Sequence, residues 1–265
     1  MRGIAVIGNL AKDTIDGGRP RVGGAPYHAA RALRLLGGSS RIVARSAEAD
    51  RRVLVGPLAA LGVPWTWRAA ASTTTFEIRY DGEEREMSIG DPGSPWTLAD
   101  AQAVGRAAWI QVGGLTRADF PPDVLAALAR DCRLALDGQA LVRPAVAGPL
   151  VLDSDFDPAV LRHVRALKLN EEEVAVLGGE DQVATLGVPE LLLTHGSTGA
   201  LLISGGVRER IPVRRIDTDD PTGAGDAFLA AYSWSRAAGH RPVSAARHAA
   251  TTAARVLELT ATPAE

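Results

Sequence analysis

Cysteine is nearly absent from this sequence, because Cys132 is the only one among 265 residues. A single thiol excludes an internal disulfide framework and is typical of a protein from a reducing compartment. The chain also lacks an apolar run long enough to span a membrane. The short apolar run at its start, Met1–Gly8, is typical of a buried strand rather than of a signal peptide. We therefore expect a cytoplasmic protein that does not enter a membrane.

An excess of charge of either sign is missing as well. The 29 basic and 31 acidic side chains leave a net charge of −2, so electrostatics give no reason to expect a nucleic acid as a partner. The sequence also contains no G-x-x-x-x-G-K-[ST] P-loop, no G-x-G-x-x-G after its first apolar run and no G-x-S-x-G elbow. Cys132 and the five histidines show no zinc-ligand spacing. These absences argue against several common nucleotide, hydrolase and zinc sites.

What the sequence does contain is an alternation of short apolar runs with helical patterns. This alternation predicts an α/β fold with a mostly parallel sheet, in which ligands gather at the C-terminal ends of the strands. Strands are expected at Ile4–Ile7, Arg41–Ala44, Trp109–Val112, Arg133–Leu136, Ala166–Leu169, Leu191–Thr194 and Ala200–Ile203. Helices are expected at Pro26–Leu36, Arg51–Leu61, Leu98–Ala107, Pro122–Arg130, Pro158–His163 and Glu171–Leu177.

One region departs from this alternation. Ser72–Tyr80 is rich in β-branched residues, Asp81-Gly82 forms a turn signal, and Glu84–Ile89 follows. This pattern predicts a hairpin with partly exposed faces. We expect a single domain over residues 1–265, with a small β element built from about 13–21 and 72–90.

The most informative stretch is Asp219–Phe228, with the sequence DDPTGAGDAF. A helix that opens on Gly-Ala-Gly presents its first backbone N–H groups without side chains to block them, which makes an anion site. Asp226 stands in the first turn of that helix. An Asp there is also favoured by capping alone, but an acid beside a bound phosphate is what a base in phosphoryl transfer requires.

Residues 220–228 (DPTGAGDAF) closely resemble the C-terminal signature of the PfkB family, the ribokinase-like carbohydrate kinases. The resemblance implies a ribokinase-like fold and ATP-dependent phosphorylation of an alcohol group on a sugar or polyol. It assigns the anion hole to Gly223, Ala224 and Gly225 and the catalytic base to Asp226. It also implies that the small β element is a lid over the active site, and that such lids can pair into a homodimer.

Asn170 and Glu173 have the spacing of a capping box, which explains both residues structurally. The PfkB family carries an Asn-x-x-Glu motif at this place that is associated with Mg²⁺ and phosphate. Mg²⁺ typically binds through few carboxylates, water and nucleotide phosphates. Both roles can hold at once, so Asn170 and Glu173 are candidates for a cofactor and Mg²⁺ site.

The polar turn Thr194–Gly199 follows a predicted strand, and its glycines would let a nucleotide approach the backbone. A plain hairpin turn is the structural alternative. The family has a similar Thr-x-Gly-x-x-Gly loop that lines the ATP site, and Thr194, Gly196 and Gly199 correspond to it. The resemblance also implies a cofactor contact for Thr222 and a monovalent-cation site, with K⁺ used by several relatives, near Asp220 and Thr222.

At the other end of the chain, Asp13 and the pair Gly23-Gly24 match positions that hold sugar hydroxyls in the family. A carboxylate that accepts from two hydroxyls forms charge-assisted hydrogen bonds, whereas a solvated loop acid is the commoner role for a single Asp. Many family members have Asn at the position of His28. This departure makes His28 a candidate substrate contact and leaves the acceptor open.

Two alternatives to a sugar or polyol kinase remain. The first is a nucleoside kinase of the same family, and the second is a non-catalytic sugar- or nucleotide-binding relative. The stretches Thr73–Phe76 and Asp137–Arg143 are similar to the inositol-kinase branch, which favours an inositol-like acceptor as the first substrate to test.

Overall fold

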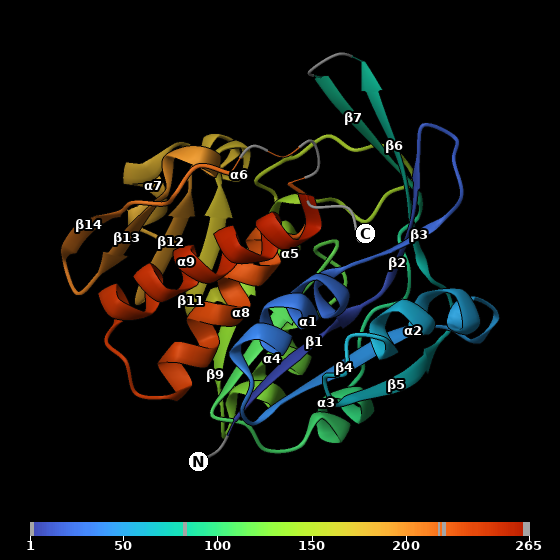
Figure 1. Cartoon of the computed structure of the whole chain (residues 1–265), viewed down its shortest axis with the longest axis horizontal. Coiled ribbons are helices and arrows are strands. Elements are labelled where there is room, and N and C mark those ends of the chain that lie inside the picture. The colour runs from blue at the N-terminus through green and yellow to red at the C-terminus, as the bar shows by residue number, and fades with distance from the viewer. Residues whose placement is uncertain (1–2, 82–83, 217, 219–220, 262–265) are drawn as a thin grey trace.

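The computed structural model describes residues 3–81, 84–216, 218 and 221–261. Its main sheet contains β1 (Ile4–Asn9), β4 (Ser40–Ala47), β5 (Trp65–Ala70), β8 (Trp109–Gly113), β9 (Arg133–Asp137), β11 (Val164–Asn170), β12 (Glu190–Thr194), β13 (Ala200–Ser204) and β14 (Val207–Ile211). The strand order is β14-β13-β12-β11-β9-β8-β1-β4-β5 (Figure 1). In this order, each pair of neighbouring strands from β12 through β5 is parallel. Strand β13 is antiparallel to both of its neighbours, β12 and β14.

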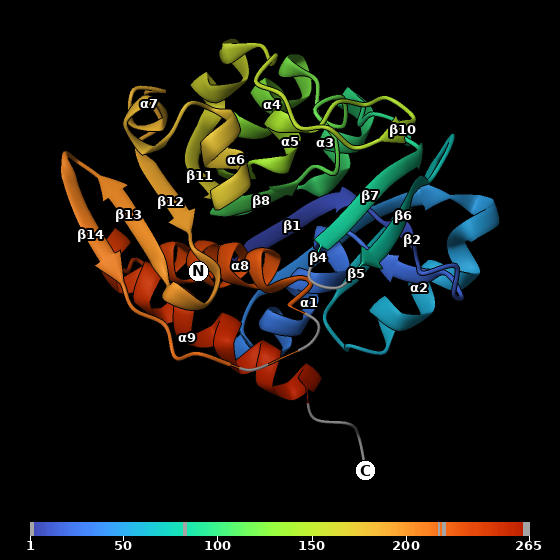
Figure 2. The same ribbon diagram turned by 90° about the horizontal axis from the view of Figure 1, so that it is seen from above.

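Helices cover both faces of this sheet (Figure 2). They are α1 (Ala25–Leu36), α2 (Arg51–Ala59), α3 (Leu98–Val104), α4 (Pro122–Ala129), α5 (Gln139–Val142), α6 (Glu171–Val176), α7 (Glu180–Ala184), α8 (Ala224–Ala237) and α9 (Pro242–Ala261). Helices α1, α2, α8 and α9 lie on one face, and α3, α4, α6 and α7 lie on the other. The alternation of strands and helices in the sequence therefore builds a three-layer α/β structure.

The central strands are buried on both faces because helices cover both. In β1, Ile4 and Val6 belong to the apolar layer of α1, α8 and α9, while Ala5 and Ile7 belong to the layer of α3, α4, α6 and α7. This alternation explains why the strand is an uninterrupted apolar run rather than a half-polar one.

A second, smaller sheet contains β2 (Ala11–Ile15), β3 (Arg21–Gly23), β6 (Thr74–Asp81), β7 (Glu84–Asp91) and β10 (Gly148–Pro149), in the order β10-β7-β6-β2-β3. The β6–β7 hairpin projects from the body of the molecule (Figure 1). Phe76, Ile78 and Ile89 are buried on one face of this small sheet, together with Ala11 and Leu115. The small sheet therefore has its own apolar contact with the main body.

Some elements differ from the sequence predictions. Pro158–His163 is a 3₁₀ helix rather than an α-helix, and strand β11 follows it directly at Val164. Helix α3 ends at Val104, not Ala107, since Gly105 takes a positive φ of 68°. Strand β5 was not predicted, because its residues are half-exposed at the edge of the sheet and contain no apolar run.

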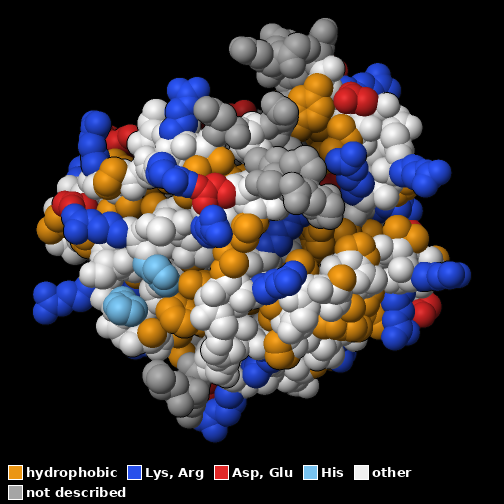
Figure 3. Space-filling model, in the orientation of Figure 1, with side chains coloured by type: hydrophobic (Ala, Val, Ile, Leu, Met, Phe, Trp, Pro, Cys, Tyr) orange, Lys and Arg blue, Asp and Glu red, His pale blue; other side chains and the backbone are white. Residues whose placement is uncertain are grey.

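Among the described residues, no helix is both long and apolar enough to cross a membrane. On the face of the molecule in Figure 3, Lys and Arg side chains are scattered among apolar and neutral ones. This scatter agrees with the small net charge of −2.

Candidate active site

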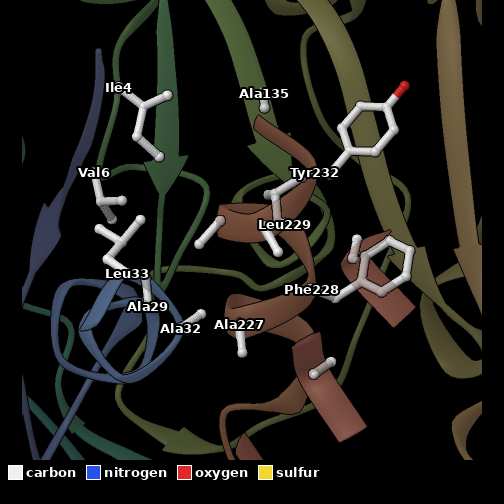
Figure 4. Packing of buried hydrophobic residues seen from close by; sticks show 14 of the residues in the cluster. Ile4, Val6, Ala29, Ala32, Leu33, Ala135, Ala227, Phe228, Leu229 and Tyr232 are labelled. Carbon is white, nitrogen blue, oxygen red and sulfur yellow. The ribbon is translucent and has the colours of Figure 1, made fainter. Parts of the chain in front are cut away.

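The site is built around the start of helix α8. Gly223 precedes the helix in a left-handed conformation (φ 85°, ψ −1°), which glycine adopts at little cost. The body of α8 is fixed in the core, where Ala227, Phe228 and Leu229 belong to the same buried cluster as residues of β1 and α1 (Figure 4). A rigid helix with an uncapped glycine start presents its first N–H groups and the positive end of its dipole to an anion.

Asp226 lies in the first turn of α8. Its pKa is raised to about 7, chiefly by burial and then by the negative charge of Asp137, while Lys168 and Arg143 oppose the rise. Its backbone is held as well, because Gln111 Nε2 of β8 donates to the Asp226 carbonyl oxygen at 3.3 Å. The Asp226 backbone is therefore tied to β8, and its carboxyl group has a pKa suited to a general base near neutral pH.

Lys168 and Asp137 form a buried ion pair beside Asp226. The Lys168 ammonium donates to both Asp137 oxygens, at 3.0 and 3.2 Å, and both residues are almost fully buried. Burial alone would lower the pKa of Lys168, but Asp137, Glu173 and Asp226 together raise it above its usual value. A Cβ placed on Gly225 would lie 3.0 Å from Lys168 Nζ. The lysine therefore carries positive charge directly against the predicted anion hole.

Asn170 and Glu173 form the capping box that their spacing predicts. Asn170 Oδ1 accepts from the Glu173 N–H, and Glu173 Oε2 accepts from the Asn170 N–H, both at 2.8 Å. Burial and the charge of Asp137 raise the pKa of Glu173, whereas Lys168 lowers it. The second oxygen of Glu173, Oε1, is buried and makes no hydrogen bond to any described residue. Capping thus uses one carboxylate oxygen and leaves the other available.

The described residues contain no group of three or more His, Cys, Asp or Glu side chains arranged to hold a metal ion. Mg²⁺ usually binds through few protein ligands, water and substrate phosphates, and does not require such a group.

The turn Thr194–Gly199 lies beside Asn170, because the parallel register pairs Thr194 with Asn170. Thr194 Oγ1 donates to the Leu169 carbonyl oxygen at 3.2 Å, and the His195 N–H donates to the Gly199 carbonyl oxygen at 2.8 Å. Gly199 has a φ of 107°, and a Cβ there would lie 2.3 Å from the Ile211 carbonyl oxygen. Gly199 is thus required for the fold of the turn, in addition to any contact with a nucleotide.

The residues expected to hold the acceptor also gather. Asp13 on β2 lies against Gly23 on β3, where a Cβ would approach Asp13 Oδ2 to 2.0 Å. Gly24 has a φ of 94° and immediately precedes α1. His28, in the first turn of α1, is buried and touches Gly223. His28 therefore joins the N-terminal candidates to the start of α8.

The other two candidates precede the anion hole. Thr222 is partly buried directly before Gly223, whereas Asp220 lies outside the described residues.

Sequence reasoning missed the roles of Lys168, Asp137 and Gln111. Each had a local signal, because a Lys or Gln inside a buried strand, and an Asp at the end of one, needs a polar partner. Their partners lie on other elements, so only the fold brings them together. Arg143 also reaches the site electrostatically and lies 5.9 Å over the Phe76 ring of the small sheet.

Three known proteins are similar to this chain in sequence or structure. Fructokinase-2 of Zea mays is 26% identical over 240 residues, which are 78% of this chain and 68% of that protein. Inositol 3-kinase of Oryza sativa subsp. japonica is 30% identical over 184 residues, or 62% of this chain and 44% of that protein. A solved structure, described as a pyrophosphate-dependent kinase in the ribokinase family complexed with a pyrophosphate analog and myo-inositol, has a TM-score of 0.84 at 24% identity. It covers 96% of this chain and 95% of its own, which establishes the ribokinase-like fold.

The family of pfkB carbohydrate kinases matches residues 18–263. The match includes the small sheet apart from β2, which precedes residue 18, together with the buried charges and the start of α8. This chain therefore belongs to the pfkB family of carbohydrate kinases and is a phosphotransferase that acts on a sugar or polyol.

Proposed function

We propose that this kinase transfers the terminal phosphate of ATP to a hydroxyl group of a cyclic polyol of the inositol type, with Asp226 as the general base. The observation that carries the proposal is the partly buried Asp226 in the first turn of α8, whose carboxyl group has a pKa raised to about 7. The similarity to inositol 3-kinases of Oryza sativa subsp. japonica and Zea mays, at 30% and 32% identity, supports the acceptor class.

In the proposed reaction, the acceptor hydroxyl oxygen attacks the terminal phosphorus and the hydroxyl proton passes to the Asp226 carboxylate. The bond between that phosphorus and the bridging oxygen breaks, and ADP leaves with the bond's electrons. The amides of Gly223, Ala224 and Gly225 stabilise negative charge on the transferring group. Lys168, which lies against Gly225, adds a fixed positive charge at the same place.

The remaining candidates divide between donor and acceptor. Asp13, Gly23 and Gly24 would hold the acceptor hydroxyls, with His28 nearby. Thr194, Gly196, Gly199 and Thr222 would line the nucleotide side.

Mg²⁺ fits the site, because Glu173 keeps one buried oxygen outside its capping hydrogen bond. Asn170 and Glu173 would hold the ion through water. When bound, Mg²⁺ supplies positive charge to the phosphates. A K⁺ site near Asp220 and Thr222, a homodimer formed through the small sheet, and a cytoplasmic location remain predictions.

Asp226→Asn tests the proposal directly. Loss of the base should lower kcat by about 10²- to 10⁴-fold, while ATP binding measured by calorimetry persists. Turnover within roughly tenfold of wild type would show that Asp226 is not the base.

The same variant makes a prediction about stability. Because the folded-state pKa of Asp226 is raised, its ionisation above about pH 7 opposes folding. At pH 8 the variant should therefore unfold at no lower temperature than wild type.

The acceptor is tested by a screen of inositols, hexoses and nucleosides with MgATP as the donor. We expect myo-inositol or a close isomer to give the highest kcat/KM. A nucleoside preference would favour the nucleoside-kinase alternative, to which a solved nucleoside kinase of Burkholderia thailandensis is structurally similar, with a TM-score of 0.74.

Pyrophosphate is a second candidate donor. Two similar structures, with TM-scores of 0.84 and 0.83, are described as pyrophosphate-dependent kinases. The proposed anion hole and Lys168 would contact only phosphate groups, so they are compatible with either donor. The same screen run with Mg-pyrophosphate distinguishes the two donors. A higher kcat/KM with pyrophosphate than with ATP would identify pyrophosphate as the preferred donor.

A further inference from the structure

His28 and Gly223 are in direct contact, although they are far apart in the sequence. A Cβ placed on Gly223 would lie 2.3 Å from His28 Nδ1, 2.5 Å from its Cγ and 2.8 Å from its Cβ. The imidazole of α1 therefore lies directly against the backbone that begins α8. Position 223 requires glycine for two independent reasons, the positive φ of 85° and this close approach.

The position of His28 is itself fixed by its surroundings. Its N–H donates to the Gly24 carbonyl oxygen at 3.2 Å, and its side chain is 7% exposed. The Tyr27 ring lies edge-on to the imidazole, with ring centroids 5.2 Å apart. One turn further along α1, Ala32 and Leu33 belong to the same buried cluster as Ala227 of α8 (Figure 4).

We propose that His28 is a positioning residue, which holds the Gly223 backbone in the conformation that aims the first N–H groups of α8 at the transferring phosphate. This inference rests on the proposed anion hole and revises the expectation that His28 is a substrate contact. It also gives α1, which starts at the acceptor candidates Gly23-Gly24, a direct contact with the phosphate side of the site.

The atoms in contact suggest a discriminating pair of variants. Cβ and Cγ of His28 have counterparts in asparagine, and an Asn side-chain amide atom occupies the place of Nδ1, whereas alanine keeps only Cβ. His28→Asn therefore preserves the contact with Gly223 but lacks the far side of the ring. His28→Ala removes most of the contact.

For a positioning role, His28→Ala should lower kcat by about 10- to 100-fold, because misplacement of reacting groups by about 1 Å can cost a factor of about 100. The acceptor KM should stay within about twofold of wild type, because no acceptor contact is lost. His28→Asn should recover most of the lost kcat, again without a change in acceptor KM. A raised acceptor KM in His28→Asn would identify His28 as a substrate contact and overturn the proposal, even if His28→Ala does not fold.

Gly223→Ala separates this inference from the anion hole on which it rests. The matched control is Gly239→Ala at the other end of α8, where φ is also positive (93°) and a Cβ would meet no described atom within 4 Å. Wild-type kcat in Gly223→Ala would overturn the anion hole and this inference together. A large loss of kcat in Gly223→Ala, combined with wild-type kcat in His28→Ala, would overturn only the role of His28. The proposal expects losses in both variants and none in Gly239→Ala.

Discussion

At the scale of single residues, the site gathers several charged side chains that are buried or partly buried. Asp137, Lys168 and Glu173 are buried and Asp226 is partly buried, and the charge of Asp137 raises the pKa of each of the other three. Burial of charge is costly unless partners compensate it. Asp226 is only partly compensated, and a perturbed acid of this kind is typical of a functional site.

The pH dependence of kcat should report this arrangement. Only the carboxylate form of Asp226 can accept a proton, so kcat should fall as the pH drops below about 7. Asp137→Asn removes a negative neighbour that raises this pKa, so the acidic limb should move to lower pH. Lys168→Met removes a positive neighbour that lowers it, so the limb should move to higher pH.

Profiles of kcat against pH for wild type and the two variants check this prediction. Shifts in the same direction, or no shifts, would contradict the proposed coupling. Unfolding temperatures are needed as a control, because loss of one member of a buried ion pair typically costs about 3–5 kcal/mol.

At the scale of elements, two capping boxes in the described part of the chain differ in their surroundings. Asn170 and Glu173 cap α6 at the candidate site, whereas Thr97 and Asp100 cap α3, which lies in the same helical layer but contributes no candidate site residue. Asn170→Ala and Thr97→Ala should each destabilise the fold by about 1 kcal/mol, as the loss of an N-cap usually does.

The two variants should differ in catalysis. Asn170→Ala is expected to raise the Mg²⁺ concentration needed for half-maximal activity, whereas Thr97→Ala is not. Urea unfolding and Mg²⁺ titrations measure the two effects separately. Equal Mg²⁺ dependence in both variants would leave Asn170 with a capping role alone.

Elements were predictable from the sequence where the local pattern is decisive. The buried run of β1 and the Pro-initiated helix α1 are at the expected places. Strand β5 was missed because Trp65 and Trp67 lie at a half-exposed sheet edge, where no apolar run marks the strand. The start of α8 was recognisable because its small residues and its acid are consecutive. The Lys168–Asp137 pair was not recognisable from the sequence, because its two residues lie on separate strands that are brought together only by sheet pairing.

At the scale of the whole molecule, the site exists only when distant segments fold together. Gln111 of β8 holds the Asp226 backbone, His28 of α1 touches Gly223, and Lys168 of β11 lies against Gly225. These contacts join the first, middle and last parts of the chain across one sheet. We therefore expect the predicted single domain to unfold cooperatively.

Tryptophan fluorescence can test this cooperativity, because Trp109 and Trp96 are each 1% exposed and belong to the apolar layers on opposite faces of the main sheet. Trp109→Phe and Trp96→Phe each remove the fully buried tryptophan of one layer. If both layers depend on the shared sheet, urea transitions followed by fluorescence of either variant, by far-UV circular dichroism and by kinase activity should coincide. Separate midpoints for the two layers would show that they unfold independently and would contradict the single domain. If activity alone is lost at lower urea than the spectroscopic signals, the small sheet or the start of α8 unfolds locally before the rest. At those places the site depends on contacts between elements rather than within them.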